Sequence, residues 1–311
     1  MEDLIKIIIA GLDNAGKTSI ITALNKKYDF SKDIISLTPT IKVEYHAMTF
    51  LDKKTIFWDM GGQEKYRKLY HDKQNLYFEG TDLILFIIDI QDKERFDTSL
   101  EYLDMIIHFF EKSKLNVPLI VSFHKFDPNI RNDDQFIDNI NYLREIILER
   151  YQNFKILFQQ TSIYDIISII QLISYGLSVF DEKFFDLSAL LENYLKVFGS
   201  KALIVFDKNG IIISEFYSDV IEPEIYIELL ESIKDHMFLL KRMQEESYES
   251  DYNFSNIGDE LLSYLHRIHF DSQSFFVSVI IQDQENLKEV FLEKFSEFLI
   301  DLKNILKPLI L

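Results

Sequence analysis

The chain of 311 residues is 47% hydrophobic and carries a formal net charge of −18 at pH 7. It can therefore bury a sizeable core, and its acidity excludes nucleic acid as a main partner, because phosphate backbones bind basic faces. It contains no cysteine, which excludes disulfides, zinc–cysteine sites, thiol catalysis and cysteine-linked lipid anchors. The sequence has neither a signal peptide nor an apolar run long enough to span a membrane. We therefore expect a cytoplasmic protein with no direct membrane anchor, which partners could recruit to a membrane.

Apolar strands alternate with helices through the first 180 residues. We expect strands at residues 4–10, 41–51, 54–59, 83–90, 117–124 and 154–160, with a tight turn at residues 52–53. We expect one helix beginning at residue 19 and others at residues 93–114, 132–151 and 164–180. Asn132 and Asp133 are alternative N-caps of the third helix. This alternation predicts a mostly parallel sheet with helices on both faces, which binds ligands at the carboxyl ends of its strands.

The pattern changes near residue 181. Helices are expected at residues 184–198, 223–244 and 286–305, and short strands at residues 202–206, 211–216, 256–262, 264–270 and 275–282. Asn209-Gly210 is a strong hairpin signal between the first two of these strands. We therefore predict an α/β domain over residues 1–180, followed by an α+β domain over residues 181–311. The second domain carries no phosphate or metal motif, so we interpret it as an interaction domain.

Residues 11–18 carry the pattern of a phosphate-binding P-loop, G-x-x-x-x-G-K-[ST], between a predicted strand and a predicted helix. Gly11 and Gly16 let the backbone turn its N–H groups toward anionic oxygens, and the helix N-terminus adds a favourable dipole. In such loops the lysine, here Lys17, reaches the β- and γ-phosphates, and the hydroxyl of the following residue, here Thr18, ligates Mg²⁺. The predicted nucleotide-binding residues of this loop are Asp13, Asn14, Ala15, Gly16, Lys17, Thr18 and Ser19.

Four downstream residues indicate hydrolysis of a nucleoside triphosphate with Mg²⁺. Thr40 precedes a strand, where its hydroxyl can bind the metal and its N–H the γ-phosphate, although a plain Pro-Thr turn would have the same sequence. Asp59 ends a strand and can hold the metal. Gly62 can turn its N–H onto the γ-phosphate, and Gln63 can orient the attacking water. We predict the catalytic residues Gln63, Lys17, Thr40 and Gly62, and the metal ligands Thr18, Thr40 and Asp59.

His124-Lys125-Phe126-Asp127 follows an apolar strand and resembles the guanine-reading motif Asn-Lys-x-Asp. This resemblance implies that the Asp127 carboxylate accepts hydrogen bonds from two guanine nitrogens that adenine cannot match. It also implies that the stem of Lys125 lies over the base. His124 stands where the motif has asparagine. Ser162 and Ile163 follow the last strand and resemble the loop whose backbone N–H reads guanine O6.

These motifs and their order make residues 1–180 resemble a small GTPase. The P-loop and Pro39-Thr40-Ile41 resemble Arf-type GTPases, whereas His124, residues 41–44 and Thr161-Ser162-Ile163 resemble Rag/Gtr GTPases. A GTPase followed by a roadblock-type, longin-like domain at this total length also resembles Rag/Gtr proteins. We therefore interpret the chain as Rag/Gtr-like with an Arf-like P-loop. The resemblance implies Mg²⁺ with GTP or GDP as ligands, and dimerisation through residues 181–311 with a second GTPase subunit or a second copy. It further implies roadblock-type scaffold proteins and a GTPase-activating protein as partners.

Two functions compete for this chain, and an Arf-like trafficking GTPase is a further alternative. In the first, the protein is a GTP-hydrolysing switch whose loops around Thr40 and Gly62 are ordered only by the triphosphate. In the second, it is a non-hydrolysing scaffold in which the nucleotide is structural. The combination of Thr40, Asp59 and Gln63 favours the switch, because a scaffold does not need these residues. We interpret Arg67, in the loop expected after Gln63, as part of an exposed switch face rather than as a catalytic arginine.

Overall fold

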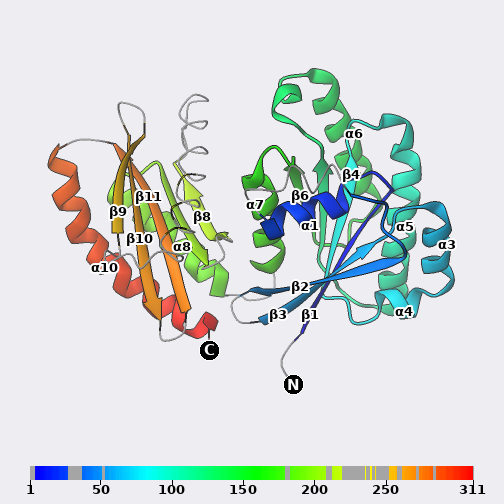
Figure 1. Ribbon diagram of the computed structural model, residues 1–311, viewed down its shortest axis with the longest axis horizontal. Helices are drawn as coiled ribbons and strands as arrows, with labels where there is room; N and C mark the ends of the chain where they lie inside the picture. Colours follow the sequence, from blue (N-terminus) through cyan, green and yellow to red (C-terminus); the bar gives the residue numbers. More distant parts are fainter. Residues whose placement is uncertain are drawn as a thin grey trace. The chain divides into compact units, whose positions relative to one another are not determined.

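The computed structural model describes residues 4–26, 37–50, 53–178, 183–207, 212–218, 252–257, 261–270, 273–282 and 285–310, together with residues 235, 239 and 242. The chain forms two compact units, Met1–Gly176 and Leu177–Leu311 (Figure 1). The predicted boundary at residues 180–181 lies outside the described residues and stays a prediction. Within the described residues, no helix is long and apolar enough to cross a membrane.

The first unit is built on a six-stranded sheet in the order β2-β3-β1-β4-β5-β6. β2 runs antiparallel to β3, and the other neighbouring pairs are parallel. β1 and β4 are buried along nearly their whole length, because helices cover both faces, and this explains their continuous apolar sequences. The turn predicted at residues 52–53 lies partly outside the described residues. The strands are β1 Ile5–Gly11, β2 Val43–Phe50, β3 Lys53–Met60, β4 Leu83–Asp89, β5 Leu119–His124 and β6 Ile156–Thr161.

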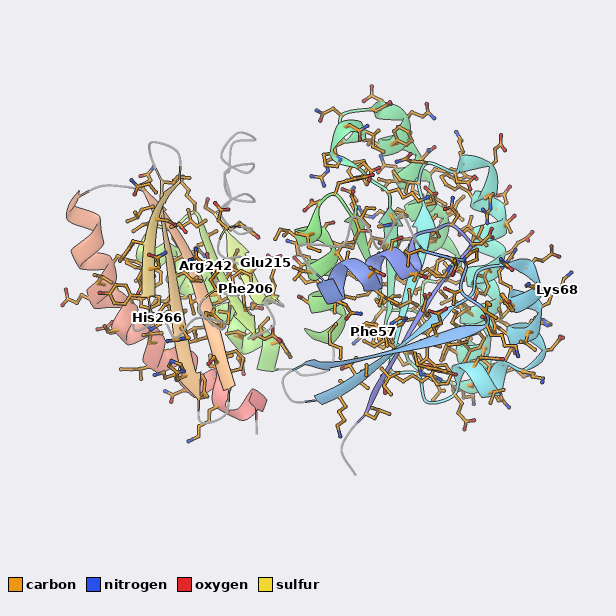
Figure 2. All side chains as sticks on the ribbon, in the orientation of Figure 1. Phe57, Lys68, Phe206, Glu215, Arg242 and His266 are labelled. Atoms are coloured by element: carbon orange, nitrogen blue, oxygen red, sulfur yellow. The ribbon has the colours of Figure 1, made fainter. Side chains whose placement is uncertain are left out.

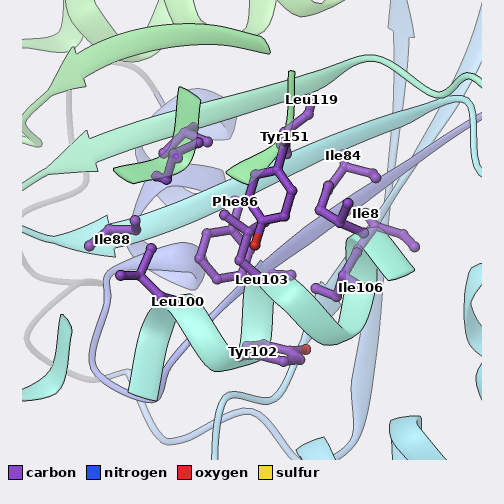
Figure 3. Close-up of a cluster of buried hydrophobic side chains, with 14 of the residues drawn as sticks. Ile8, Ile84, Phe86, Ile88, Leu100, Tyr102, Leu103, Ile106, Leu119 and Tyr151 are labelled. Carbon is purple, nitrogen blue, oxygen red and sulfur yellow. The ribbon is translucent and has the colours of Figure 1, made fainter. Parts of the chain in front are cut away.

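Successive side chains of the parallel strands pack against helices on opposite faces of the sheet. On one face, Ile8 of β1 and Phe86 of β4 join a buried cluster with Leu103 of α5 (Figure 3). On the other face, α7 approaches the strands at Gly176, where an added Cβ would lie 2.7 Å from a methyl group of Leu83. The helices of this unit are α1 Lys17–Lys26, α3 Glu64–Asp72, α4 Gln74–Phe78, α5 Phe96–Ser113, α6 Asp134–Arg150 and α7 Ile166–Ser178.

The helices differ from the sequence predictions at three places, one of which is α4, a helix that the sequence analysis does not predict. The helix predicted over residues 93–114 divides into a 3₁₀ turn at Lys93–Arg95 and the longer α5. The loop predicted around Arg67 is wrong, because α3 runs through this position. Of the two predicted N-caps of α6, Asp133 is the one observed. Its carboxylate accepts a hydrogen bond from the Gln135 backbone N–H at 3.0 Å.

The second unit contains a five-stranded antiparallel sheet in the order β8-β7-β11-β10-β9. The strand predicted over residues 256–262 is wrong as one element, because β9 ends at Ile257 and β10 begins at Leu261. The predicted Asn209-Gly210 turn lies outside the described residues. So does most of the helix predicted over residues 223–244, of which residues 235, 239 and 242 are helical. The elements are α8 Lys183–Phe198, β7 Ala202–Asp207, β8 Ile212–Tyr217, β9 Tyr252–Ile257, β10 Leu261–Phe270, β11 Gln273–Gln282 and α10 Glu285–Ile310.

Aromatic side chains pack the helices of the second unit together and onto its sheet. The rings of Phe198 in α8 and Phe291 in α10 have centroids 5.1 Å apart. Tyr264 and His266, which share one face of β10, have ring centroids 4.9 and 5.2 Å from that of Phe295 in α10. Figure 2 labels His266. This packing gives the second unit a core of its own. The predicted fold class, a mostly parallel α/β domain followed by an α+β domain, is thus confirmed.

Candidate functional site

The P-loop turns between β1 and α1 with backbone angles that only glycine adopts easily. Gly11 and Gly16 have φ angles of +144° and +96°. A Cβ on Gly11 would lie 2.3 Å from the Ile87 carbonyl oxygen, and a Cβ on Gly16 would lie 2.4 Å from the His124 ring. The loop is therefore held closely against the ends of β4 and β5, and substitution of either glycine would force these segments apart.

A cavity of about 250 Å³ lies beside this loop at the carboxyl ends of the strands. It brings together most of the residues predicted to bind phosphate and to act in hydrolysis. Ala15, also predicted, is buried within the loop instead of lining the cavity. The sequence did not identify Leu37, Thr38 and Pro39 as lining residues. Among the residues that the structure describes, the lining is Asp13, Asn14, Gly16, Lys17, Thr18, Ser19, Leu37, Thr38, Pro39, Thr40, Gly62 and Gln63.

Lys17 places a buried ammonium group at this cavity. Its Nζ donates a hydrogen bond to the Leu12 carbonyl oxygen at 2.7 Å, so the side chain folds over its own loop. Burial lowers the pKa of Lys17 from 10.5 to about 8, and the carboxylates of Asp59 and Asp13 oppose this shift. A buried cation with few compensating partners favours an anionic ligand, such as a phosphate, in the cavity.

Thr18, Thr40 and Asp59 come from three different segments and meet at one point. The Thr18 hydroxyl donates to Asp59 Oδ2 at 2.5 Å, and the Thr40 hydroxyl lies 3.0 Å from Thr18 Oγ1 and 3.2 Å from Asp59 Oδ2. Asp59 is fully buried, and its Oδ1 has no hydrogen-bond partner among the described residues. Two hydroxyls and one carboxylate form a hard oxygen set that suits Mg²⁺, whose remaining ligands are commonly phosphate oxygens and water. The residues therefore fit the predicted metal.

The segment after Asp59 passes directly against the P-loop. A Cβ on Gly62 would lie 2.1 Å from the Asp13 backbone nitrogen, so glycine is needed for this approach. Gln63 is half-buried, lines the cavity and precedes the first turn of α3. Arg67 donates from Nε to the Gly62 carbonyl oxygen at 3.1 Å and stacks over the Tyr102 ring. The contacts of Arg67 that the structure describes thus hold the segment after Asp59 in place.

His124 joins the end of β5 to neighbouring segments. It is buried, and its Nδ1 lies 2.8 Å from the Thr161 hydroxyl, which also contacts Ser122 at 2.6 Å. Burial, together with the nearby Lys125 charge, lowers the pKa of His124 from 6.5 to about 3, so the imidazole is neutral. Its ring occupies the space that the missing Cβ of Gly16 leaves open.

The predicted base-reading residues also converge. Asp127 Oδ1 accepts a hydrogen bond from the Ser162 hydroxyl at 2.6 Å. The Ser162 backbone N–H donates to Ser168 Oγ, so of the two predicted loop residues Ile163 is the better candidate donor to a base. Lys125, expected to lie over a base, forms an ion pair with Asp89 Oδ2 at 2.6 Å.

The sequence motifs did not identify two residues of the site, both of which lie in the connection after β4. Gln91 donates from Nε2 to the Lys125 carbonyl oxygen at 2.7 Å and to Asp127 Oδ2 at 3.2 Å. Arg95 pairs with Asp13 Oδ1 at 2.7 Å. The available signal was their position just after a buried strand, where polar residues of this fold class line the ligand site.

The first unit is similar in sequence to known proteins. Residues 1–169 match the ADP-ribosylation factor family. The chain is 31% identical over 147 residues to "ADP-ribosylation factor-like protein 3" of Saccharomyces cerevisiae, covering 46% of this chain and 71% of that protein. It is 34% identical over 105 residues to "ADP-ribosylation factor-like protein 5A" of Homo sapiens, covering 33% of this chain and about half, 53%, of that protein.

Among solved structures, the Arl6 BBS3 small GTPase from Trypanosoma brucei with bound nucleotide analogue GppNp is similar at 16% identity and a TM-score of 0.45. That comparison covers 57% of this chain and 97% of the other. The family match ends before the second unit begins.

Proposed function

The chain belongs to the ADP-ribosylation factor family, and we propose on this basis that it is an Arf-like molecular switch that binds GTP and GDP and slowly hydrolyses GTP. The proposal depends on the meeting of Thr18, Thr40 and Asp59 beside the P-loop cavity. Asp59 Oδ1 has no hydrogen-bond partner among the residues that the structure describes. The sequence favoured a Rag/Gtr interpretation. The family match and both relatives support its Arf-type alternative better.

In this proposal the first unit binds the phosphates through the P-loop and Lys17. The inward-facing backbone of the loop donates N–H groups, and the buried Lys17 ammonium supplies a positive charge. Thr18, Thr40 and Asp59 would hold Mg²⁺, which when bound offsets the negative charge of the β- and γ-phosphates. Thr40 and Gly62 lie on separate segments at the cavity, so a γ-phosphate that contacts both would order them together.

Hydrolysis would depend on Gln63, which lines the cavity and whose amide could orient a water molecule toward the γ-phosphate. Arg67 points to the Gly62 carbonyl and the Tyr102 ring, so we assign it no catalytic role. We therefore propose that turnover is slow until a GTPase-activating protein supplies charge stabilisation, which is typically worth about 10³–10⁵ in rate. Asp127 would select guanine through its two carboxylate oxygens.

The test is single-turnover hydrolysis of GTP by the full chain carrying Gln63→Leu. GTP binding should persist, because Gln63 lies outside the P-loop, while hydrolysis should fall by roughly 10²-fold, the range for a lost positioning group. Lys68→Ala is a matched control on α3, the helix that Gln63 precedes. Lys68 is exposed, and among its described ion pairs it has only the one with Glu64 of the same helix (Figure 2). Equal hydrolysis by wild type and Gln63→Leu would remove Gln63 from the mechanism.

We also propose that the second unit is a roadblock-type interaction domain that dimerises with a second copy or a related GTPase subunit. Of the strands that the structure describes, β8 and β9 are outermost in an antiparallel sheet, and outer strands can pair with another chain. Roadblock-type scaffold proteins are the proposed further partners, and recruitment by them would bring a cytoplasmic protein to a membrane.

A further inference from the structure

Asp89 and Gln91, at the end of β4, hold the segment that follows β5; we call these two residues the β4 clamp. Asp89 Oδ2 pairs with Lys125 Nζ at 2.6 Å, and Asp89 Oδ1 accepts the Gln91 backbone N–H at 3.0 Å. The Gln91 amide donates to the Lys125 carbonyl at 2.7 Å and to Asp127 Oδ2 at 3.2 Å. The β4 clamp therefore contacts both the backbone and the side chains of the base-reading segment, Lys125 to Asp127.

The backbone at Lys125 needs such support. Its φ angle of +62° lies in the left-handed region, which most residues other than glycine, asparagine and aspartate adopt at a cost. The Gln91 hydrogen bond fixes the Lys125 carbonyl, and the Asp89 ion pair fixes its side chain. Since Asp127 follows two residues later, this conformation determines where its carboxylate lies.

The hydrogen bonds to Asp127 leave room for two further donors. An ionised carboxylate has about four acceptor positions, two on each oxygen. The Ser162 hydroxyl uses one position on Oδ1, and the Gln91 amide uses one on Oδ2. Counting only contacts with the described residues, one position thus stays on each oxygen. Guanine presents two adjacent N–H donors, on N1 and on its 2-amino group. With both oxygens held from the protein side, the carboxylate cannot turn away from this paired arrangement.

We propose that Gln91 is a specificity-positioning residue, which holds Asp127 so that both carboxylate oxygens face a guanine base. The inference rests on the proposed function, guanine-nucleotide binding, and deepens it. Hypoxanthine, the base of ITP, lacks the 2-amino group and offers Asp127 only one N–H donor. Loss of the Gln91 amide should therefore weaken GTP binding more than ITP binding.

The experiment measures dissociation constants of GTP, GDP, ITP and ATP for the full chain, by competition with a fluorescent GDP. Gln91→Ala removes the hydrogen bonds to the Lys125 carbonyl and to the charged Asp127. It should weaken GTP binding by roughly tenfold or more and should lower the preference for GTP over ITP. The ratio of GTP to GDP affinity should not change, because the phosphate contacts are intact. Gln91→Glu keeps the size of the side chain but removes its donors, so it should have at least the same effect.

Lys93→Ala is the control, because Lys93 is an exposed residue of the same connection and should leave all four affinities unchanged. Melting temperatures of all variants separate a loss of folding from a loss of specificity. If wild type prefers GTP to ATP while both Gln91 variants keep the wild-type GTP-to-ITP ratio, the role of Gln91 is overturned and the proposed function stands. If wild type does not prefer GTP to ATP, the proposed function itself fails.

Discussion

His124 and Gly16 are complementary in shape. The imidazole lies where a Cβ on Gly16 would be, so one residue provides the space that the other fills. His124 stands where the guanine-reading motif has asparagine, and its ring contacts the P-loop by packing while Nδ1 bonds to Thr161. A charged imidazole would be poorly solvated in this buried position, and therefore the neutral form is required.

This requirement predicts a pH-dependent stability. The folded-state pKa of His124, about 3, lies below its ordinary value of 6.5, so the unfolded chain takes up the proton first as the pH falls. The stabilisation is complete above pH 6.5 and is lost progressively toward pH 3. Between pH 7 and pH 5, wild type should lose about 2 kcal/mol more unfolding free energy than His124→Asn.

Urea denaturation followed by tryptophan fluorescence measures this difference. Trp58, the single tryptophan of the chain, lies in β3 and reports on the first unit. His124→Asn cancels the contributions of all other titrating groups, because they are common to both proteins. Equal losses in the two proteins would show that His124 titrates normally and is not held neutral by burial.

At the scale of elements, Lys6 joins three pieces of the first unit. From β1, its Nζ donates to the carbonyl oxygens of Tyr77 and Glu79, at the end of α4, at 2.8 and 2.7 Å. The same ammonium lies 3.9 Å from the centre of the Trp58 ring on β3. Burial lowers the pKa of Lys6 to about 8, opposed by Asp82 and Glu79. The one polar residue of an apolar strand thus satisfies the end of a helix.

Lys6→Met tests this connection. The methionine keeps the apolar stem but leaves the two carbonyl groups without their donor, so the unfolding free energy should fall by about 1–3 kcal/mol. Trp58 fluorescence should also change, since the cation leaves the ring. Lys68→Ala, which breaks a solvent-exposed pair with Glu64, should change neither quantity measurably. A fully stable Lys6→Met protein would mean that water replaces the ammonium at no cost.

The cap of α6 gives a second prediction at this scale. Asp133→Ala removes the acceptor of the Gln135 N–H, so it should lower the unfolding free energy by about 1 kcal/mol. Asn132→Ala, at the neighbouring position, should have a much smaller effect. Urea denaturation of both variants measures the two losses of unfolding free energy. A larger loss for Asn132→Ala would show that Asn132, and not Asp133, caps α6.

At the scale of the whole molecule, the two units have separate tasks in our proposal. Every predicted nucleotide contact lies in residues 1–176, while residues 177–311 supply a sheet with its own core. Light scattering should give a mass of twice 36.9 kDa for the full chain and a monomer for a chain ending at residue 178. If the shorter chain forms a dimer, the dimer interface lies on the first unit. If the full chain is a monomer, the proposed self-association through the second unit is contradicted.

Local patterns in the sequence were sufficient for much of this fold and site. Gly11, Gly16 and Lys17 stand at spacings that the geometry of a phosphate loop requires, and buried parallel strands are apolar runs. The sequence failed where contacts join distant segments. Gln91 lies 36 residues from Asp127, and Arg95 lies 82 residues from Asp13, so no local spacing connects them. Motif resemblance also favoured Rag/Gtr proteins, whereas comparison over residues 1–169 indicates the ADP-ribosylation factor family.

The phosphate loop, the order of strands and helices and the division into an α/β and an α+β part could be predicted from local sequence patterns, because these features depend on backbone geometry and the periodicity of burial. The sequence also predicted that Thr18, Thr40 and Asp59 share one metal, and the fold brings their oxygens within hydrogen-bond distance. The packing of His124 beside Gly16 and the hydrogen bond from Gln91 to Asp127 were found only in the folded chain. These contacts depend on the strand order β3-β1-β4-β5. This order places the carboxyl ends of strands that are distant in sequence side by side at one edge of the sheet. Strand order follows from the packing of the whole domain, and no local pattern encodes it.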